Sequence, residues 1–282
     1  MEEEIIEVTL DKTVLKQLGY EIKYNFEDIL EQILLEKTKK IIYFKKNGED
    51  VKDLVIPSTY TYEGKKYKIS KIGDRVFEYN TFLTSVIIPD SVTEIGQATF
   101  IECKSLTNVI IPESVKKIDC GAFAYCESLP SIILSDTITK IYESTFIYCK
   151  SLISITIPRS VTEIRNGAFY NCSSLTSVTI PDSVRKIEGH TFSNCTSLTN
   201  IIIPKGVTEI GDSAFYNCSS LTNVTIPDSV TRIGKEAFAE CSSLTNLIIP
   251  NSVKKIGDSA FKNVQHIEYH GMAIPWGAKS MN

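Results

Sequence analysis

The stretch that decides the fold is residues 215–237, FYNCSSLTNVTIPDSVTRIGKEA. It is one unit of a 23-residue repeat, and phenylalanine at its first position marks the phase along the chain. These phenylalanines are Phe77, Phe100, Phe123, Phe146, Phe169, Phe192, Phe215, Phe238 and Phe261. A fixed period between about 20 and 50 residues indicates a solenoid, in which each unit contacts only its neighbours.

Each unit carries a Leu–x–x–Val–x–Ile–Pro core that begins six residues after the phenylalanine. The alternation predicts a short strand whose Val and Ile side chains face inward. Proline ends that strand because it has no N–H to donate. Ser135 replaces proline in one unit, where we expect a slightly longer strand. A second apolar pair, such as Val230 and Ile233, predicts the returning side of the coil.

Cysteine recurs three residues after the phenylalanine in seven units, and only Cys120 lies outside this position. Stacked units would hold the seven side chains in parallel, which does not suit disulfide geometry. No Cys–x2–Cys pair of the kind that binds zinc is present. The pattern therefore predicts a ladder of small buried side chains, an exposed Cys120, and neither a metal nor another cofactor.

The pattern divides the chain into residues 1–46, a solenoid of about nine units over 47–265, and a cap or tail over 266–282. A solenoid has an exposed apolar end that needs a lid. Residues 1–46 are expected to be such a cap, with helices, and a small separate binding domain is the alternative. A hairpin is expected over residues 60–67.

Two helices are predicted in the first 46 residues. Asp11 would cap the first, which Gly19 would close. Asn25 would cap the second, because apolar residues from Phe26 to Leu34 recur at helical spacing. Short strands are expected over residues 5–10 and 40–45.

Composition argues against several classes of function. The net charge of −4 gives no support to nucleic-acid or anionic-membrane binding, and no apolar run reaches the roughly 18 residues of a membrane helix. The chain has three histidines, and none has an Asp or Ser partner that recurs with the repeat, which argues against a histidine-based active site. Residues 1–4 lack the pattern of a secretory signal, so a cytoplasmic protein and one whose signal was removed both stay open.

The outward side of the predicted strands is the candidate binding surface. Four of its positions are isoleucine, which is more apolar than a solvated sheet needs, and extended apolar patches mark interaction sites. Strand propensity of Ile and Thr is the alternative explanation. The predicted partner-binding residues are Ile87, Asn108, Ile110, Ser131, Ile133, Ser154, Thr156, Ser177, Thr179, Asn200, Ile202, Asn223 and Thr225.

The full pattern, Leu–x–x–Val–x–Ile–Pro–x–x–Val–x–x–Ile–Gly–x–x–Ala–Phe–x–x–Cys, resembles the BspA-type, or Treponema pallidum-type, leucine-rich repeat over roughly residues 50–265. The resemblance implies a right-handed, mostly β arc, an α/β-type repeat solenoid of 23-residue units with a parallel sheet on its concave face. Many members are secreted or surface proteins that bind host matrix proteins or other cells, and none supplies a catalytic motif.

The expected function is therefore an adhesin-like, protein-binding module of a bacterial surface protein, with a host matrix or cell-surface protein as the partner. A structural or self-associating scaffold without a dedicated ligand is the alternative. The sequence leaves the oligomeric state open.

Overall fold

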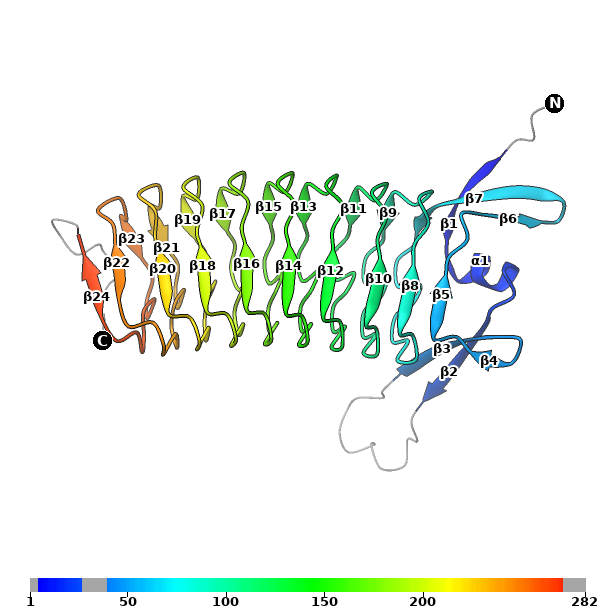
Figure 1. The fold of residues 1–282 in the computed structure, drawn as a ribbon, viewed down its shortest axis with the longest axis horizontal. Helices are drawn as coiled ribbons and strands as arrows, with labels where there is room; N and C mark the ends of the chain where they lie inside the picture. The colour runs from blue at the N-terminus through cyan, green and yellow to red at the C-terminus, as the bar shows by residue number, and fades with distance from the viewer. Residues whose placement is uncertain (1–4, 27–39, 271–282) are drawn as a thin grey trace.

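The computed structural model describes residues 5–26 and 40–270. The chain winds into successive coils of 23 residues that stack along the long axis of the molecule (Figure 1). Each complete coil contributes one strand to each of two parallel ladders. The predicted solenoid, mostly β and built from 23-residue units, is confirmed.

The first ladder, which we call the front sheet, contains three-residue strands that end just before the proline position. From β8 to β20 the paired strands are parallel and shifted by one repeat, so that Ser154 lies beside Ser177 and Thr156 beside Thr179. The pairing is interrupted between β10 and β12 and between β20 and β22. The strands are β5 (Asp53–Val55), β8 (Ser85–Ile87), β10 (Asn108–Ile110), β12 (Ser131–Ile133), β14 (Ser154–Thr156), β16 (Ser177–Thr179), β18 (Asn200–Ile202), β20 (Asn223–Thr225), β22 (Leu247–Ile249) and β24 (Ile267–Tyr269).

The second ladder, the second sheet, forms on the returning side of the coil, and each of its regular strands ends in a buried isoleucine. Its strands are β1 (Ile6–Leu10), β7 (Lys65–Ile72), β9 (Glu94–Ile95), β11 (Lys117–Ile118), β13 (Lys140–Ile141), β15 (Glu163–Ile164), β17 (Lys186–Ile187), β19 (Glu209–Ile210), β21 (Arg232–Ile233) and β23 (Lys255–Ile256). The expected second apolar pair is thus confirmed.

The repeat phenylalanines form a continuous stack through the core. Neighbouring ring centroids are 5.1 to 6.0 Å apart and the rings are nearly parallel. On this third side of the coil, backbone bonds run forward along the stack, such as Phe146 N to Ala168 O at 2.9 Å. The stack therefore joins every coil to the next independently of the two sheets.

The seven phased cysteines are buried free thiols, as predicted. Each thiol donates to the carbonyl oxygen of the phenylalanine 26 residues earlier, as from Cys149 to Phe123 O at 3.1 Å. Burial raises the pKa of the Cys149, Cys195 and Cys241 thiols to about 12. Cys120 is half-buried rather than exposed, because it packs beside Asp119, whose carboxylate accepts its backbone N–H.

The N-terminal segment extends the second sheet. Strand β1 pairs in parallel with β7, and helix α1 (Lys12–Gln17) follows it with Asp11 as the predicted cap. The carboxylate of Asp11 accepts the N–H groups of Thr13 and Val14, each at 2.8 Å. Leu10 and Leu15 are buried in the core that continues into the first coils.

An antiparallel hairpin and a three-stranded antiparallel sheet project from the N-terminal end of the solenoid (Figure 1). One contains β6 (Thr59–Tyr62) and β7, which confirms the predicted hairpin. The other contains β2 (Glu21–Phe26), β3 (Lys40–Lys46) and β4 (Glu49–Asp50).

Two local predictions are wrong. Asn25 does not cap a helix, because it pairs with Ile41 in the β2–β3 ladder, and the remainder of that predicted helix lies outside the described residues. Ser135 does not lengthen its strand, because β12 ends at Ile133 as its neighbours do. Its side chain is buried and donates to the backbone oxygen of Glu113 at 3.1 Å.

Candidate functional site

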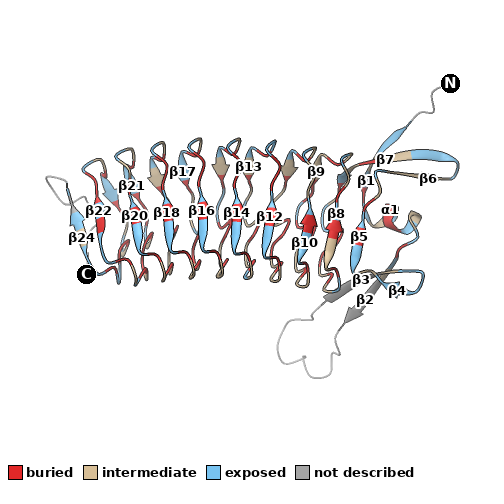
Figure 2. Cartoon of the chain, viewed as in Figure 1, coloured by how far each residue is buried: buried red, intermediate tan, exposed pale blue. Residues whose placement is uncertain are grey.

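The front sheet collects all the sequence-predicted binding residues on one face. In most of its strands the middle residue is buried and the two outer residues are exposed (Figure 2). The inward Val or Ile anchors the strand, and parallel pairing sets the outward residues in register. The result is two adjacent rows, one of Ser and Asn and the other of Ile and Thr. The residues so placed are Ile87, Asn108, Ile110, Ser131, Ile133, Ser154, Thr156, Ser177, Thr179, Asn200, Ile202, Asn223 and Thr225.

The Ile/Thr row exposes large apolar side chains. Ile133 is 79% exposed and Ile202 is 71% exposed, while Ile87, Ile110 and Ile248 are exposed to a smaller extent. The row begins with four consecutive apolar residues, Val55, Ile87, Ile110 and Ile133, and continues with threonines among which Ile202 and Ile248 lie. Paired strands of this kind are roughly 4.8 Å apart. A strip of this kind is a candidate interaction surface.

Two residues of this surface were missed in the sequence. Val55 is 61% exposed and begins the row, since it pairs with Ile87 across β5 and β8. Its position between Leu54 and Ile56 in the repeat core was the available signal. Ile153 is also exposed, just before β14, where most units carry threonine.

The C-terminal end of the row opens into a pocket of about 430 Å³. Thr225 and Ile248 from the row contribute to its wall, together with Asp228, Asn246 and His270. His270 lies 3.0 Å from the Glu268 carboxylate, so this end of the face adds polar groups to the apolar strip.

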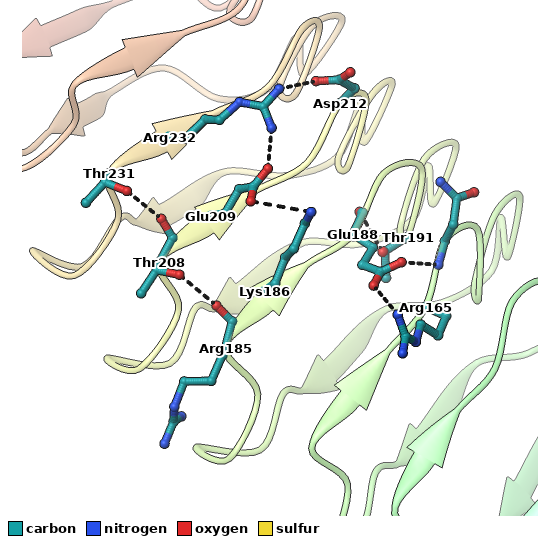
Figure 3. Close-up of polar contacts among 11 residues, drawn as sticks. Arg165, Arg185, Lys186, Glu188, Thr191, Thr208, Glu209, Asp212, Thr231 and Arg232 are labelled. Atoms are coloured by element: carbon teal, nitrogen blue, oxygen red, sulfur yellow. Dashed lines mark hydrogen bonds and ion pairs between the residues drawn. The ribbon is translucent and has the colours of Figure 1, made fainter.

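The second sheet presents a different surface, a ladder of ion pairs (Figure 3). Glu209 contacts both Lys186, at 3.4 Å, and Arg232. Closer to the N-terminus on the same sheet, Arg165 forms ion pairs with Glu163 and, at 3.1 Å, with Glu188. These side chains are all partly exposed, so each pair contributes little to stability.

The threonine hydroxyls beside this ladder also form hydrogen bonds. The Thr231 hydroxyl donates to Thr208 O at 3.2 Å, and the Thr208 hydroxyl donates to Arg185 O at 3.3 Å (Figure 3). The charges and hydroxyls of the second sheet thus largely bond to the adjacent coil. The front sheet differs, because its exposed isoleucines have no such partners within the face and gain most from a covering surface.

Catalytic and metal chemistry find little support in the part of the chain that the structure describes. Residues 5–26 and 40–270 contain no group of three or more His, Cys, Asp or Glu side chains that could hold a metal ion. The phased thiols are kept protonated by burial, which removes the thiolate that nucleophilic chemistry needs.

No helix in the described residues is both long and apolar enough to span a bilayer.

Comparison with known proteins identifies related repeats. The BspA type leucine-rich repeat region, in six copies, matches residues 70–197 and 162–274. No curated protein matches the chain.

Solved bacterial structures resemble the whole solenoid. A Treponema pallidum leucine-rich repeat protein is 25% identical, with a TM-score of 0.56, over 72% of this chain and 88% of that one. A leucine-rich repeat protein from Bacteroides ovatus is 25% identical, with a TM-score of 0.50, over 91% of this chain and 88% of that one. One from Eubacterium ventriosum shares the fold at 21% identity, with a TM-score of 0.53, over 79% and 61% of the two chains.

Proposed function

Because the chain belongs to the BspA type leucine-rich repeat family, whose repeats form protein-interaction scaffolds, we propose that it is an adhesin-like module that binds a protein partner on the front sheet. The single observation that carries this proposal is the exposed apolar row from Val55 to Ile248. The residues of this row come from separate coils, so the stacking of the coils, and not nearness in the sequence, brings them together into one surface.

The chemistry of the row indicates the kind of partner surface that would fit. Central interface residues lose water and favour apolar contacts, while the surrounding rim stays polar. Here the apolar row lies beside Ser131, Ser154 and Ser177, which can donate and accept hydrogen bonds at its margin. A partner that presents an extended, mostly apolar strip would match both rows.

By family resemblance, the proposed partner is a host matrix or cell-surface protein, and the proposed location is secreted or on the bacterial surface. Residues 1–46 are proposed to act as the cap of the first coil. The burial of Leu10 and Leu15 against that coil supports this role. Residues 266–282 are proposed as the C-terminal cap or tail.

A self-associating scaffold is the second candidate. The same observation favours it, because the exposures of Ile133 and Ile202 would fall equally if a second copy covered the row. A pull-down against extracellular matrix proteins, together with the solution mass, separates the two. A monomer that retains a matrix protein supports the adhesin-like module, whereas a multimer that retains none supports the scaffold.

Replacing Ile133 and Thr156 with lysine is expected to weaken partner binding by about tenfold or more, since the hot-spot residues at the centre of an interface each cost about 2 kcal/mol or more when truncated. The two positions belong to the same row on successive front strands. An apolar partner surface would have to desolvate two ammonium groups placed side by side. The affinity for a partner found in the pull-down is measured by calorimetry.

The matched control places lysines at Glu143 and Asn166, which are exposed and lie in a different corner of neighbouring coils. Both variants are expected to fold, because the inward residues Ile132 and Ile155 are unchanged. Unaltered affinity in the Ile133/Thr156 variant, with a loss in the control, would place the binding surface away from the front sheet.

A further inference from the structure

One junction of the solenoid lacks strand pairing in both sheets. In the front sheet, β10 pairs with β8 and β12 with β14, but β10 and β12 do not pair. In the second sheet, β11 pairs with β9 and β13 with β15, but β11 and β13 do not pair. Among the described coils this is the sole junction where both ladders stop, and we call it the seam.

Pro130 contributes to the break in the front sheet, although that sheet also stops between β20 and β22, where Thr245 holds the same repeat position. Most other coils begin this strand with an N–H that donates to the preceding coil, as Thr107 N does to Thr84 O at 2.9 Å and Thr176 N to Ile153 O at 3.1 Å. Pro130 occupies this position in the seam, and its imide nitrogen has no hydrogen to donate. The first rung of the ladder is therefore chemically absent.

The second sheet is weakened at the same place. Lys116 N donates to Thr93 O, and Thr162 N to Thr139 O, but within the described chain Thr139 N makes no matching bond to Lys116 O. Arg185 N likewise makes no bond to Thr162 O, yet Ile164 and Ile187 there still pair, whereas β11 and β13 do not. Lys117 and Lys140 occupy the same repeat position on the two sides of the seam. Lys117 pairs with Glu94 of the preceding coil and with Asp119 of its own coil, and Lys140 pairs with Glu163 of the following coil, so these ion pairs do not cross the seam. Like charge alone does not break a ladder, because β21 and β23 still pair with Arg232 beside Lys255.

The third side of the coil stays closed across the seam. Glu102 N donates to Ala124 O at 2.9 Å, the Phe100 and Phe123 rings stack with their centroids 5.3 Å apart, and the Cys126 thiol donates to Phe100 O at 3.3 Å. Among the described residues, each hydrogen bond across the two sheet sides involves at least one side chain. The carboxylate of Glu113 accepts from the Ser135 hydroxyl at 3.1 Å, and the Lys117 amino group lies 5.7 Å from the Tyr142 ring centroid.

We propose that the seam is a built-in hinge between two solenoid segments, residues 53–122 and 123–270, which pivot about the phenylalanine stack. Opening requires only side-chain contacts to give way on both sheet sides, while the backbone bonds of the stack stay intact. The pivot changes the spacing between Ile110 and Ile133, so it adjusts the exposed row to the curvature of whatever covers it. The hinge itself does not depend on the proposed function.

Two pairs of spin labels test the hinge in the full chain. One pair replaces Asn108 and Asn200, which lie on opposite sides of the seam, and the other replaces Ser131 and Asn223, which lie on one side. Both pairs use exposed front-sheet positions four coils apart, about 20 Å at the roughly 4.8 Å spacing of paired strands. Cys120→Ser removes the half-buried thiol, and the buried thiols of the ladder do not react.

The expected result is a distance distribution across the seam that is at least about twice as broad as that of the matched pair, because hinge motion widens only distances that cross the hinge. Pro130→Thr restores the missing donor and is expected to narrow the first distribution to the width of the second. Equal widths in the parent protein would overturn the hinge. An unchanged width in Pro130→Thr would overturn the role given to Pro130.

Discussion

Raising the pH from about 8 to about 10 is expected to destabilise the solenoid steeply, because an unfolded thiol ionises near pH 8.5. In the folded chain the phased thiols keep their protons, since burial raises the pKa of Cys149, Cys195 and Cys241 to about 12. Burial also raises the pKa of the other four thiols of the ladder, Cys103, Cys126, Cys172 and Cys218.

The direction follows from these raised values. A group whose pKa is higher in the folded state contributes its full stability below the unfolded pKa and loses it as the pH rises toward the folded pKa. One such thiol gives a slope of about 1.4 kcal/mol per pH unit, so the three thiols whose pKa is about 12 together give roughly 4 kcal/mol per pH unit between about pH 9 and pH 12, and the other four raised thiols act in the same direction. Thermal unfolding followed by circular dichroism should show Tm falling sharply through this window.

A variant with Cys149, Cys172 and Cys195 replaced by alanine is the control. It loses three thiol-to-carbonyl bonds and is expected to be less stable at neutral pH. Its stability should nevertheless fall less steeply with pH, because only four of the seven thiols remain. A parent protein whose Tm is the same at both ends of the pH range would show that the ladder does not hold its protons.

The second large effect is expected from Phe169→Ala, which should cost about 3–5 kcal/mol of folding free energy, the usual range for a buried phenylalanine. Phe169 is fully buried and stacks on Phe146 and on Phe192, each with a centroid separation of 5.5 Å. The loss of both ring contacts adds to the loss of buried area. Urea unfolding measures the change.

Phe261→Ala is the matched control at the end of the array. Phe261 stacks on Phe238 at 6.0 Å and terminates the phased series. A central residue supports two interfaces between coils and a terminal one supports a single interface, so the terminal variant should lose less stability. Equal losses would contradict the nearest-neighbour account of this solenoid.

The repeat made most of the fold predictable. Each coil packs the equivalent residues in the same way, so the period of Phe, Leu and Cys predicted which side chains are buried. The alternation around Val and Ile predicted the outward rows. The thiol ladder followed from phase alone. The role of each thiol as a donor to a phenylalanine carbonyl did not, because that bond joins residues 26 positions apart and depends on the pitch of the coil.

Long-range pairing explains what the sequence did not show. Asn25 and Phe26 begin a helical apolar pattern, but pairing with β3 places both in a strand, since tertiary contacts override local preference. Ser135 leaves the strand length unchanged because its hydroxyl finds a partner in the preceding coil. The seam could not be predicted from the sequence, because it is recognised only by the missing strand pairing in both sheets. The sequence did show Pro130 as the one proline at its repeat position.

The sequence predicted which residues form the exposed row of the front sheet, but it did not predict where the row begins. Register between paired strands is set by the constant repeat length, which placed Ile133, Thr156 and Thr179 side by side. Val55 escaped notice because the inserted hairpin separates its unit from the regular series, and only the pairing of β5 with β8 brings it into the row.

Photo-crosslinking tests the central claim, that the front sheet is the partner surface, most directly. A photoreactive residue is placed at Thr179 on the exposed row or at Lys186 on the second sheet, both exposed and in the same coil. With a matrix protein retained in the pull-down, the label at Thr179 is expected to form the covalent adduct and the label at Lys186 to form none. An adduct from Lys186 without one from Thr179 would contradict the account.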